Sequence, residues 1–268
     1  MPIQRIESID DERLDVFRNM RTRNWTQESG RFVVEGALLA ERLLQSDYLC
    51  DSVLVDEKYR ERFETQFPNQ QIYCLPHHEV QELVGFEFHR GILAAGKRKP
   101  LGNFSDFRFP TLTVGVIPVL CGIEDPENLG GMLRSCAGMG VPHVVIGPGC
   151  CDPFSRRALR VAMGTTLQLS LYRAPKLIQD LQRLRESEVD FRSYAAALTH
   201  QAKELAEVQP TGNCLLFFGN ERNGLPESIL EEVDYHVKIS MADAISSLNV
   251  GVAAGIFLFH FTRARPTQ

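Results

Sequence analysis

The sequence predicts an α/β protein made of a small unit followed by a larger one with a mostly parallel sheet. Two observations support this prediction. Strand-like and helix-like runs alternate along most of the 268 residues, and the segment 97–110 interrupts the alternation with basic residues, two prolines and a glycine. The length is enough for one large domain or two ordinary ones. We therefore expect a first domain at 1–98, a linker at 99–110 and a second domain at 111–265.

The first domain is expected to be a small α/β unit of ordinary domain size. A short helix at 9–20 begins with Asp10, a residue type that caps helix N-termini. The strands are then expected at 32–35, 52–56, 71–75 and 91–96, and the helices at 37–45, 57–66 and 78–84.

The second domain shows the same alternation over a longer stretch, which predicts a parallel sheet covered by helices on both faces. Such sheets bind ligands beyond the carboxyl ends of their strands. Strands are expected at 111–121, 143–147, 167–172, 192–198, 214–219 and 235–239, and helices at 126–139, 155–162, 175–187, 226–232 and 248–263.

Composition is that of an ordinary globular protein, with 44% hydrophobic and 24% charged residues. The net charge of −5 does not by itself suggest a nucleic-acid partner, so phosphate contacts would depend on local basic patches. The longest apolar stretch is shorter than the roughly 20 residues of a membrane helix, and we expect a cytoplasmic protein without a membrane segment. The cysteines lack metal spacing, so neither zinc nor disulfides are expected; Cys150-Cys151 is either turn packing or a redox or metal feature.

Three segments of the second domain combine polar side chains with glycines at expected strand ends or helix starts. They are 125–134 (DPENLGGMLR), 218–226 (FGNERNGLP) and 247–255 (SLNVGVAAG). In the first segment, adjacent glycines cost about 1 kcal/mol each inside a helix, so we expect a backbone or ligand to approach them closely. Arg134 is either functional or a cation that reaches the helix edge, with Asn128 as a cap.

The other two segments also have two interpretations each. Gly219 and Gly224 bracket four polar residues, which form either a ligand-binding loop or a polar strand–helix turn. Asn249 lies in the first turn of an apolar helix, where a buried amide needs hydrogen-bond partners. The rest of that helix is expected to be a capped core helix with a Gly/Ala face. Glycine-rich dinucleotide, Walker-A and nucleophile-elbow motifs do not occur.

In this order the three segments resemble the motifs of the SpoU/TrmH branch of the SPOUT methyltransferases, which methylate ribose 2′-hydroxyls in RNA. Residues 31–36 (RFVVEG) resemble the Phe-x-x-Glu-Gly signature of that family's substrate-binding domain, a ribosomal-protein-like α/β sandwich. Residues 89–94 (HRGILA) are similar to the segment that closes this domain, and 151–164 to the stretch after the first motif. The resemblance spans roughly residues 18–262.

The resemblance implies a trefoil-knotted parallel-sheet methyltransferase domain, active as a homodimer, whose knot binds S-adenosyl-L-methionine. The positions that match the family's donor-binding residues are Gly219, Asn220, Ile239, Met241 and Leu248. Small departures occur, such as Gly251 where the third motif usually has a serine.

The catalytic role falls by resemblance on Arg134. A guanidinium is nearly always protonated, so Arg134 either positions the hydroxyl and an RNA phosphate or takes the proton. The residues that match the polar groups around this arginine are Asn128, Glu221, Ser247 and Asn249. The basic residues expected to contact RNA are Arg21, Arg23, Arg31 and Arg160.

The resemblance thus predicts S-adenosylmethionine-dependent methylation of a ribose 2′-hydroxyl in structured RNA. Ribosomal RNA is favoured over transfer RNA by fold-level analogy, because fused N-terminal domains of this type are commoner among the rRNA enzymes. A second reading is a catalytically inactive RNA-binding or ribosome-assembly factor. A third, a nucleotide-dependent oxidoreductase, lacks its glycine fingerprint.

Overall fold

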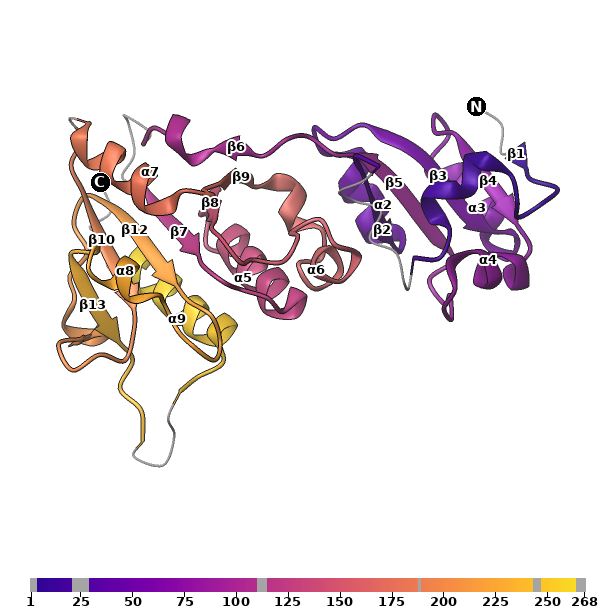
Figure 1. Ribbon diagram of the computed structural model, residues 1–268. Coiled ribbons are helices and arrows are strands. Elements are labelled where there is room, and N and C mark those ends of the chain that lie inside the picture. The colour runs from indigo at the N-terminus through magenta and orange to yellow at the C-terminus, as the bar shows by residue number, and fades with distance from the viewer. Residues whose placement is uncertain (1–3, 21–28, 110–114, 188, 243–246, 264–268) are drawn as a thin grey trace. The chain divides into compact units, whose positions relative to one another are not determined.

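The computed structural model describes residues 4–20, 29–109, 115–187, 189–242 and 247–263 (Figure 1). The chain divides into two compact units. The first comprises Met1–Pro100 with Pro153–Leu167, and the second Leu101–Asp152 with Gln168–Gln268. The segment 153–167 belongs to the first unit although it lies within the second expected domain, a discontinuity that no local sequence pattern signals.

The first unit contains a mixed sheet of order β1-β4-β3-β5-β2, in which β5 runs antiparallel to β3 and β2. Its strands are β1 (Gln4–Arg5), β2 (Arg31–Glu35), β3 (Cys50–Asp56), β4 (Ile72–Leu75) and β5 (Ile92–Lys97). Its α-helices are α2 (Ala37–Leu44), α3 (Arg60–Gln66), α4 (His77–Val84) and α6 (Arg156–Val161). The expected strands and helices are confirmed to within two residues at most ends.

A buried carboxylate explains the motif at 31–36. Glu35 is 6% exposed, and its carboxylate accepts a hydrogen bond of 2.9 Å from Arg156, with the Arg90 guanidinium 3.9 Å away. Burying a carboxylate is costly unless it is paired. Gly36, which follows, has φ +98°, a conformation that favours glycine. Arg156, one of the basic residues of the sequence, therefore compensates a buried charge.

The second unit contains a sheet of order β11-β13-β10-β12-β7-β8-β9-β6, and every pairing among its described strands is parallel. Its strands are β6 (Gly102–Asn103), β7 (Val116–Leu120), β8 (His143–Ile146), β9 (Ser170–Arg173), β10 (Phe191–Ala196), β11 (Lys203–Glu204), β12 (Asn213–Phe218) and β13 (Tyr235–Lys238). Its α-helices are α5 (Pro126–Gly138), α7 (Leu177–Glu186), α8 (Glu227–Leu230) and α9 (Val250–Arg263).

Helices cover both faces of this sheet. Successive side chains of a strand point to opposite faces, so β12 contacts helices on each side. On one face Leu215 and Phe217 of β12 belong to a buried cluster with residues of α7 and α8. On the other, Phe218 lies edge-on to Phe257 of α9, with ring centroids 5.7 Å apart. α9 also packs along α5. The parallel α/β architecture expected from the sequence is confirmed.

From Leu101 onward, the segment expected to be a linker is part of the second unit. Gly102 and Asn103 pair with β9, and Phe104, Phe107 and Phe109 are buried in the cluster of α7. The prolines and basic residues of this segment are typical of a linker, but its three phenylalanine rings are buried in the core.

Smaller differences occur elsewhere. The helix expected at 9–20 is a short 3₁₀ helix at Glu12–Phe17, and the strand expected from 167 begins at Ser170 after a 3₁₀ turn. The implied trefoil knot stays a prediction, since residues 243–246 lie outside the described residues.

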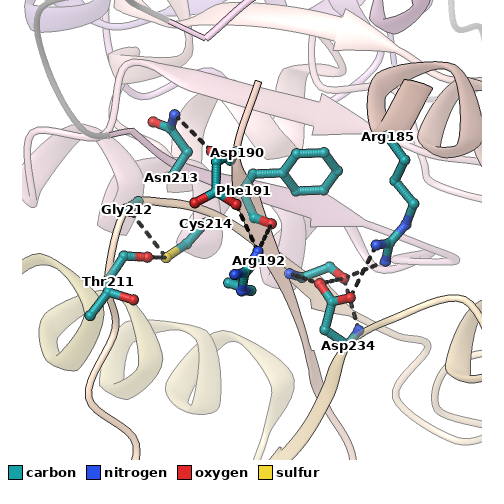
Figure 2. A network of polar contacts seen from close by, with 10 residues as sticks. Arg185, Asp190, Phe191, Arg192, Thr211, Gly212, Asn213, Cys214 and Asp234 are labelled. Carbon is teal, nitrogen blue, oxygen red and sulfur yellow. Dashed lines mark hydrogen bonds and ion pairs between the residues drawn. The ribbon is translucent and has the colours of Figure 1, made fainter. Parts of the chain in front are cut away.

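A polar network joins elements at the amino ends of the second sheet's strands (Figure 2). The Asp234 carboxylate accepts hydrogen bonds of 2.7 Å from both the backbone and the hydroxyl of Ser193, and one of 3.0 Å from Arg185. Burial opposes ionisation of this carboxylate, but the hydrogen bonds from Ser193 and Arg185 outweigh it and lower the pKa of Asp234. The network ties α7, β10 and the start of β13 together, opposite the edge where parallel sheets bind ligands.

We expect Asp234→Asn to lower the free energy of unfolding at pH 7 by roughly 1–3 kcal/mol, because the amide leaves part of this network unpaired. Since the pKa of Asp234 is depressed on folding, its contribution is present above the unfolded value of about 4 and is lost as pH falls through the folded value. Urea unfolding at neutral and acid pH measures the difference, which should shrink on acidification.

Asp190→Asn is the matched control, because the Asp190 side chain is 82% exposed and pairs with the nearby Arg192 guanidinium, while Asn213 donates to the Asp190 backbone carbonyl (Figure 2). An exposed pair of this kind contributes little, so the loss should be smaller. An equal loss in both variants at every pH would contradict a special role for Asp234.

Candidate functional site

A cavity of about 450 Å³ lies at the carboxyl ends of β10, β12 and β13, where the start of α9 closes it. Aliphatic and aromatic side chains such as Val237 and Phe257 line it together with polar groups from the loops. Every residue expected from the sequence to hold the methyl donor lines this cavity: Gly219, Asn220, Ile239, Met241 and Leu248. Ser247 and Glu221 line it as well.

Hydrogen bonds of Asn220 stabilise the loop after β12. Asn220 and Gly224 exchange backbone hydrogen bonds of 3.0 and 2.9 Å. The Asn220 side-chain oxygen accepts from the backbone N–H groups of Arg222 and Asn223, and its amide nitrogen donates to the carbonyl of Gly122 at 2.8 Å. Both polar atoms of the Asn220 side chain therefore stabilise the shape of the loop.

Gly219 is required by the close approach of that loop to itself. A Cβ atom at this position would lie 2.3 Å from the carbonyl carbon of Gly224, which is backbone and cannot rotate away. Gly224 has φ +69°. By contrast, a Cβ at Gly131 would meet nothing within 4 Å, so no backbone of the described residues approaches this glycine, and the alternative of a ligand stays a prediction.

Three predicted polar residues meet beside the cavity. The amide of Asn249 donates to the side-chain oxygen of Asn128 at 2.9 Å, and the amide of Asn128 donates to the Glu221 carboxylate at 2.7 Å. The Asn249 oxygen accepts from the backbone N–H groups at the start of α9, and Asn249 is exposed rather than buried as the sequence predicted. Residues from α5, the loop after β12 and the α9 N-terminus thus form one chain of hydrogen bonds, which we call the polar chain.

Arg134 does not belong to the polar chain. It is exposed and has no ion pair with any residue in the described part of the protein. It lies six positions after Asn128 on α5, and a helix of 3.6 residues per turn places such residues on different faces. Arg134 therefore reaches outward.

The residues expected to contact RNA have mixed outcomes. The Arg31 guanidinium pairs with Asp51 at 2.7 Å and is 40% exposed, so part of its charge is neutralised. Arg160 lies on α6 and is half-buried. Arg21 and Arg23 lie outside the described residues.

A buried histidine that was not predicted from the sequence supports the cavity. His236 is 8% exposed; its Nε2 donates to the carbonyl of Leu230 at 3.0 Å, which leaves Nδ1 to accept from the Thr199 hydroxyl at 2.8 Å. Thr199 and Leu230 both line the cavity. A histidine within the apolar strand β13 was the available signal, but only the fold brings its partners to it.

Burial also distinguishes between the two interpretations of Cys150 and Cys151. The Cys150 thiol donates to the Leu120 carbonyl at 3.2 Å, and burial raises the pKa of Cys150 to about 11 and that of Cys151 to about 12. Both thiols stay protonated near neutral pH, which fits turn packing.

The fold and the cavity define an α/β ligand-binding protein with a parallel sheet and a glycine-shaped loop at its ligand edge. The chain belongs to the SpoU rRNA Methylase family, whose model matches residues 115–259. The resemblance stated from the sequence is thereby confirmed.

Relatives match over nearly the whole chain. An uncharacterized tRNA/rRNA methyltransferase of Mycobacterium bovis is 31% identical over 98% of this chain and 93% of its own length. The 23S rRNA (guanosine(2553)-2′-O)-methyltransferase RlmP of Bacillus subtilis is 26% identical over 96% and 99%. The fold is similar to that of an AdoMet-bound rRNA methyltransferase from Sinorhizobium meliloti, with a TM-score of 0.81 at 19% identity over 97% and 98% of the two chains.

We expect Gly219→Ala to abolish the binding of S-adenosylhomocysteine, because the added methyl group forces the loop after β12 away from β12. Isothermal titration calorimetry measures this. Gly131→Ala is the control, because its methyl group meets open space and alanine favours a helix. Unchanged affinity in Gly219→Ala would show that the loop does not shape the donor site.

Proposed function

We propose that this protein transfers a methyl group from S-adenosyl-L-methionine to a ribose 2′-hydroxyl in ribosomal RNA. The observation that carries the proposal is the convergence of the donor-matching residues on one cavity, with the polar chain at its side. The relatives named above as rRNA methyltransferases support the RNA class, and the cytoplasm, where such RNA is assembled, is the expected location.

The residues of the cavity fit the donor. Its volume lies within the range of small-molecule sites, and its lining combines apolar side chains with loop backbone and hydroxyl groups, as a nucleoside with a polar tail requires. Gly219 and Asn220 would hold the donor from one side, and Ile239, Met241 and Leu248 from the other. When bound, the donor supplies an electrophilic methyl group on a sulfonium. The protein exposes that group to the acceptor and excludes water around it.

The protein's task on the acceptor side is to orient the 2′-hydroxyl. The polar chain fixes the Glu221 carboxylate at the wall of the donor cavity, and Asn128 and Asn249 are held by each other. Ser247 adds a hydroxyl at the same wall. Arg134 would hold the RNA phosphate and the ribose oxygen in line for attack.

A homodimer would bring Arg134 to the polar chain. Along α9 the residues Val252, Ile256 and Phe259 form an apolar stripe, exposed by 55%, 39% and 56%. They follow Asn249 at helical spacing, so the stripe starts at the polar chain. A second copy seated on this stripe would place its own residues beside Asn249. We propose that Arg134 of the partner subunit completes the site.

The first unit is proposed to present RNA to the site, with residues 1–98 as the substrate-binding domain and 111–265 as the methyltransferase domain. Basic and aromatic side chains lie together on it: the Lys99 ammonium is 5.1 Å from the Tyr48 ring centroid, and the Arg98 guanidinium 4.9 Å from that of Phe154. The Phe154 ring is itself fully buried, so on this surface Arg98 and Lys99 would act as cations for RNA phosphates. With Arg31 and Arg160 they form the proposed RNA surface.

The reaction is tested with labelled S-adenosylmethionine and unmodified 23S rRNA and tRNA transcripts. We expect 2′-O-methyl label in the rRNA, and a loss of about a hundredfold or more in Arg134→Ala, because an oriented charged donor is removed. S-adenosylhomocysteine affinity should be unchanged. Donor binding without transfer to any RNA, including intact ribosomal subunits, would favour the inactive assembly factor instead.

Mixing Arg134→Ala with Glu221→Ala tests whether the site is shared between subunits. If Arg134 and Glu221 act across the dimer, half of the mixed dimers' sites are intact, and about a quarter of wild-type activity should return. No recovery after subunit exchange would mean that each subunit holds a complete site.

Ile256→Glu should yield a monomer, because it places a charge in the apolar stripe. Sedimentation equilibrium measures the mass, and Glu231→Lys, on the exposed end of α8, is the control. A dimeric Ile256→Glu variant would place the interface elsewhere.

A further inference from the structure

A second cavity, of about 560 Å³, lies in the same unit on the other side of the loop after β12. It opens at the carboxyl ends of β7, β8, β9 and β12, where parallel sheets bind ligands. No residue that matches the family's motifs for the donor, apart from Asn220, lines it.

The two cavities share a wall. Asn220, Asn223 and Gly224 line both, and Glu221 between them lines the donor cavity. Asn220 also joins this wall to the loop after β7, because its amide donates to the carbonyl of Gly122, which lines the second cavity as well. The second cavity therefore lies next to the wall that carries the Glu221 end of the polar chain.

The second cavity also adjoins the start of α5. Glu124 lines it and immediately precedes Asp125, whose carboxylate caps the helix that carries Asn128. Asn128 in turn donates to Glu221. An occupant of this cavity is thus flanked by the two segments that hold the polar chain.

Its lining suits a flat heterocycle with polar edges. Three proline rings, Pro148, Pro175 and Pro226, contribute apolar surface without side-chain donors, and Leu177 and Ile229 lie beneath. Glu124 offers a carboxylate that accepts from ring or amino N–H groups, and Lys176 offers an ammonium for a ring carbonyl or a phosphate. Apolar faces with acceptor and donor groups at the rim are what proteins use to read unstacked bases.

We propose that this cavity receives the nucleobase of the nucleotide whose ribose is methylated. The inference rests on the proposed function, because methyl transfer between two bound molecules requires two sites that converge on the reacting atoms. The donor lies on one side of the loop and the acceptor base on the other, so the ribose of that nucleotide lies at the polar chain. Glu124 makes the site favour bases with N–H donors on their pairing edge.

Ser228→Trp tests the proposal, because Ser228 is exposed on α8 and lines the second cavity, which an indole would fill. Glu231→Trp, on the end of the same helix and outside the lining of both cavities, is the matched control. We expect the KM for the 23S rRNA transcript to rise about tenfold or more in Ser228→Trp alone. The affinity for S-adenosylhomocysteine should equal that of the wild type.

A second readout does not need activity. Guanosine 5′-monophosphate is added to the wild-type protein saturated with S-adenosylhomocysteine, which blocks the donor cavity, and binding is followed by saturation-transfer NMR. Binding to the wild type and to Glu231→Trp, with loss in Ser228→Trp and weakening in Glu124→Gln, would support the site. No binding to the wild type, or equal binding in all variants, would overturn it.

The two readouts separate this proposal from the proposed function. If the wild type transfers no methyl group to any RNA, but binds the nucleotide and Ser228→Trp does not, the proposed reaction is contradicted. The cavity is then still supported as a nucleotide site. An active wild type with unchanged KM in Ser228→Trp contradicts the cavity assignment alone.

Discussion

The ligand edge of this protein depends on the hydrogen bond between the Asn220 amide and the carbonyl of Gly122. These residues follow β12 and β7, two neighbouring parallel strands whose ends would otherwise lead into independent loops. The bond holds the loops together, and Gly219 lets the loop fold back onto its own backbone. A hydrogen bond that satisfies a half-buried amide also stabilises the shape of the surrounding polypeptide. One asparagine thereby shapes the walls of two cavities.

The polar chain obeys the same physical constraint on a smaller scale. Asn249 and Asn128 each present an amide nitrogen and an oxygen, and their hydrogen bonds run in one direction toward the Glu221 carboxylate. An ionised carboxylate has no proton to donate, so it ends the chain as an acceptor. The oxygen of Asn249 accepts from the first N–H groups of α9 and so acts as the helix cap. A residue placed for stability at a helix end therefore also orients the side chains at the site. Substituting it would disturb both roles.

The two ends of the strands in this sheet have different roles. At the amino ends, Asp234, Ser193 and Arg185 form a saturated network that fixes β10 and β13, and the pKa of Asp234 is lowered accordingly. At the carboxyl ends the loops carry glycines and polar groups, and the buried His236 links Thr199 of the loop after β10 to Leu230 of α8. Rigid strand starts thus allow the opposite loops to be shaped for ligands without a loss of order in the sheet.

The sequence by itself determined the strand–helix alternation and the residue types at the ligand edge. Apolar periodicity and glycine placement are local properties of the sequence, and they favour the same secondary structure wherever the segment lies in the fold. The motif residues were also recognisable, because each motif lies within one short segment of the chain. Only the tertiary structure decided that Asn128, Glu221 and Asn249 meet, that Arg134 points away from them, and that Phe104 and Phe107 belong to a core rather than a linker. It also joined Pro153–Leu167 to the first unit through the buried Glu35. These outcomes depend on contacts between residues far apart in the chain, and no local pattern encodes such pairings.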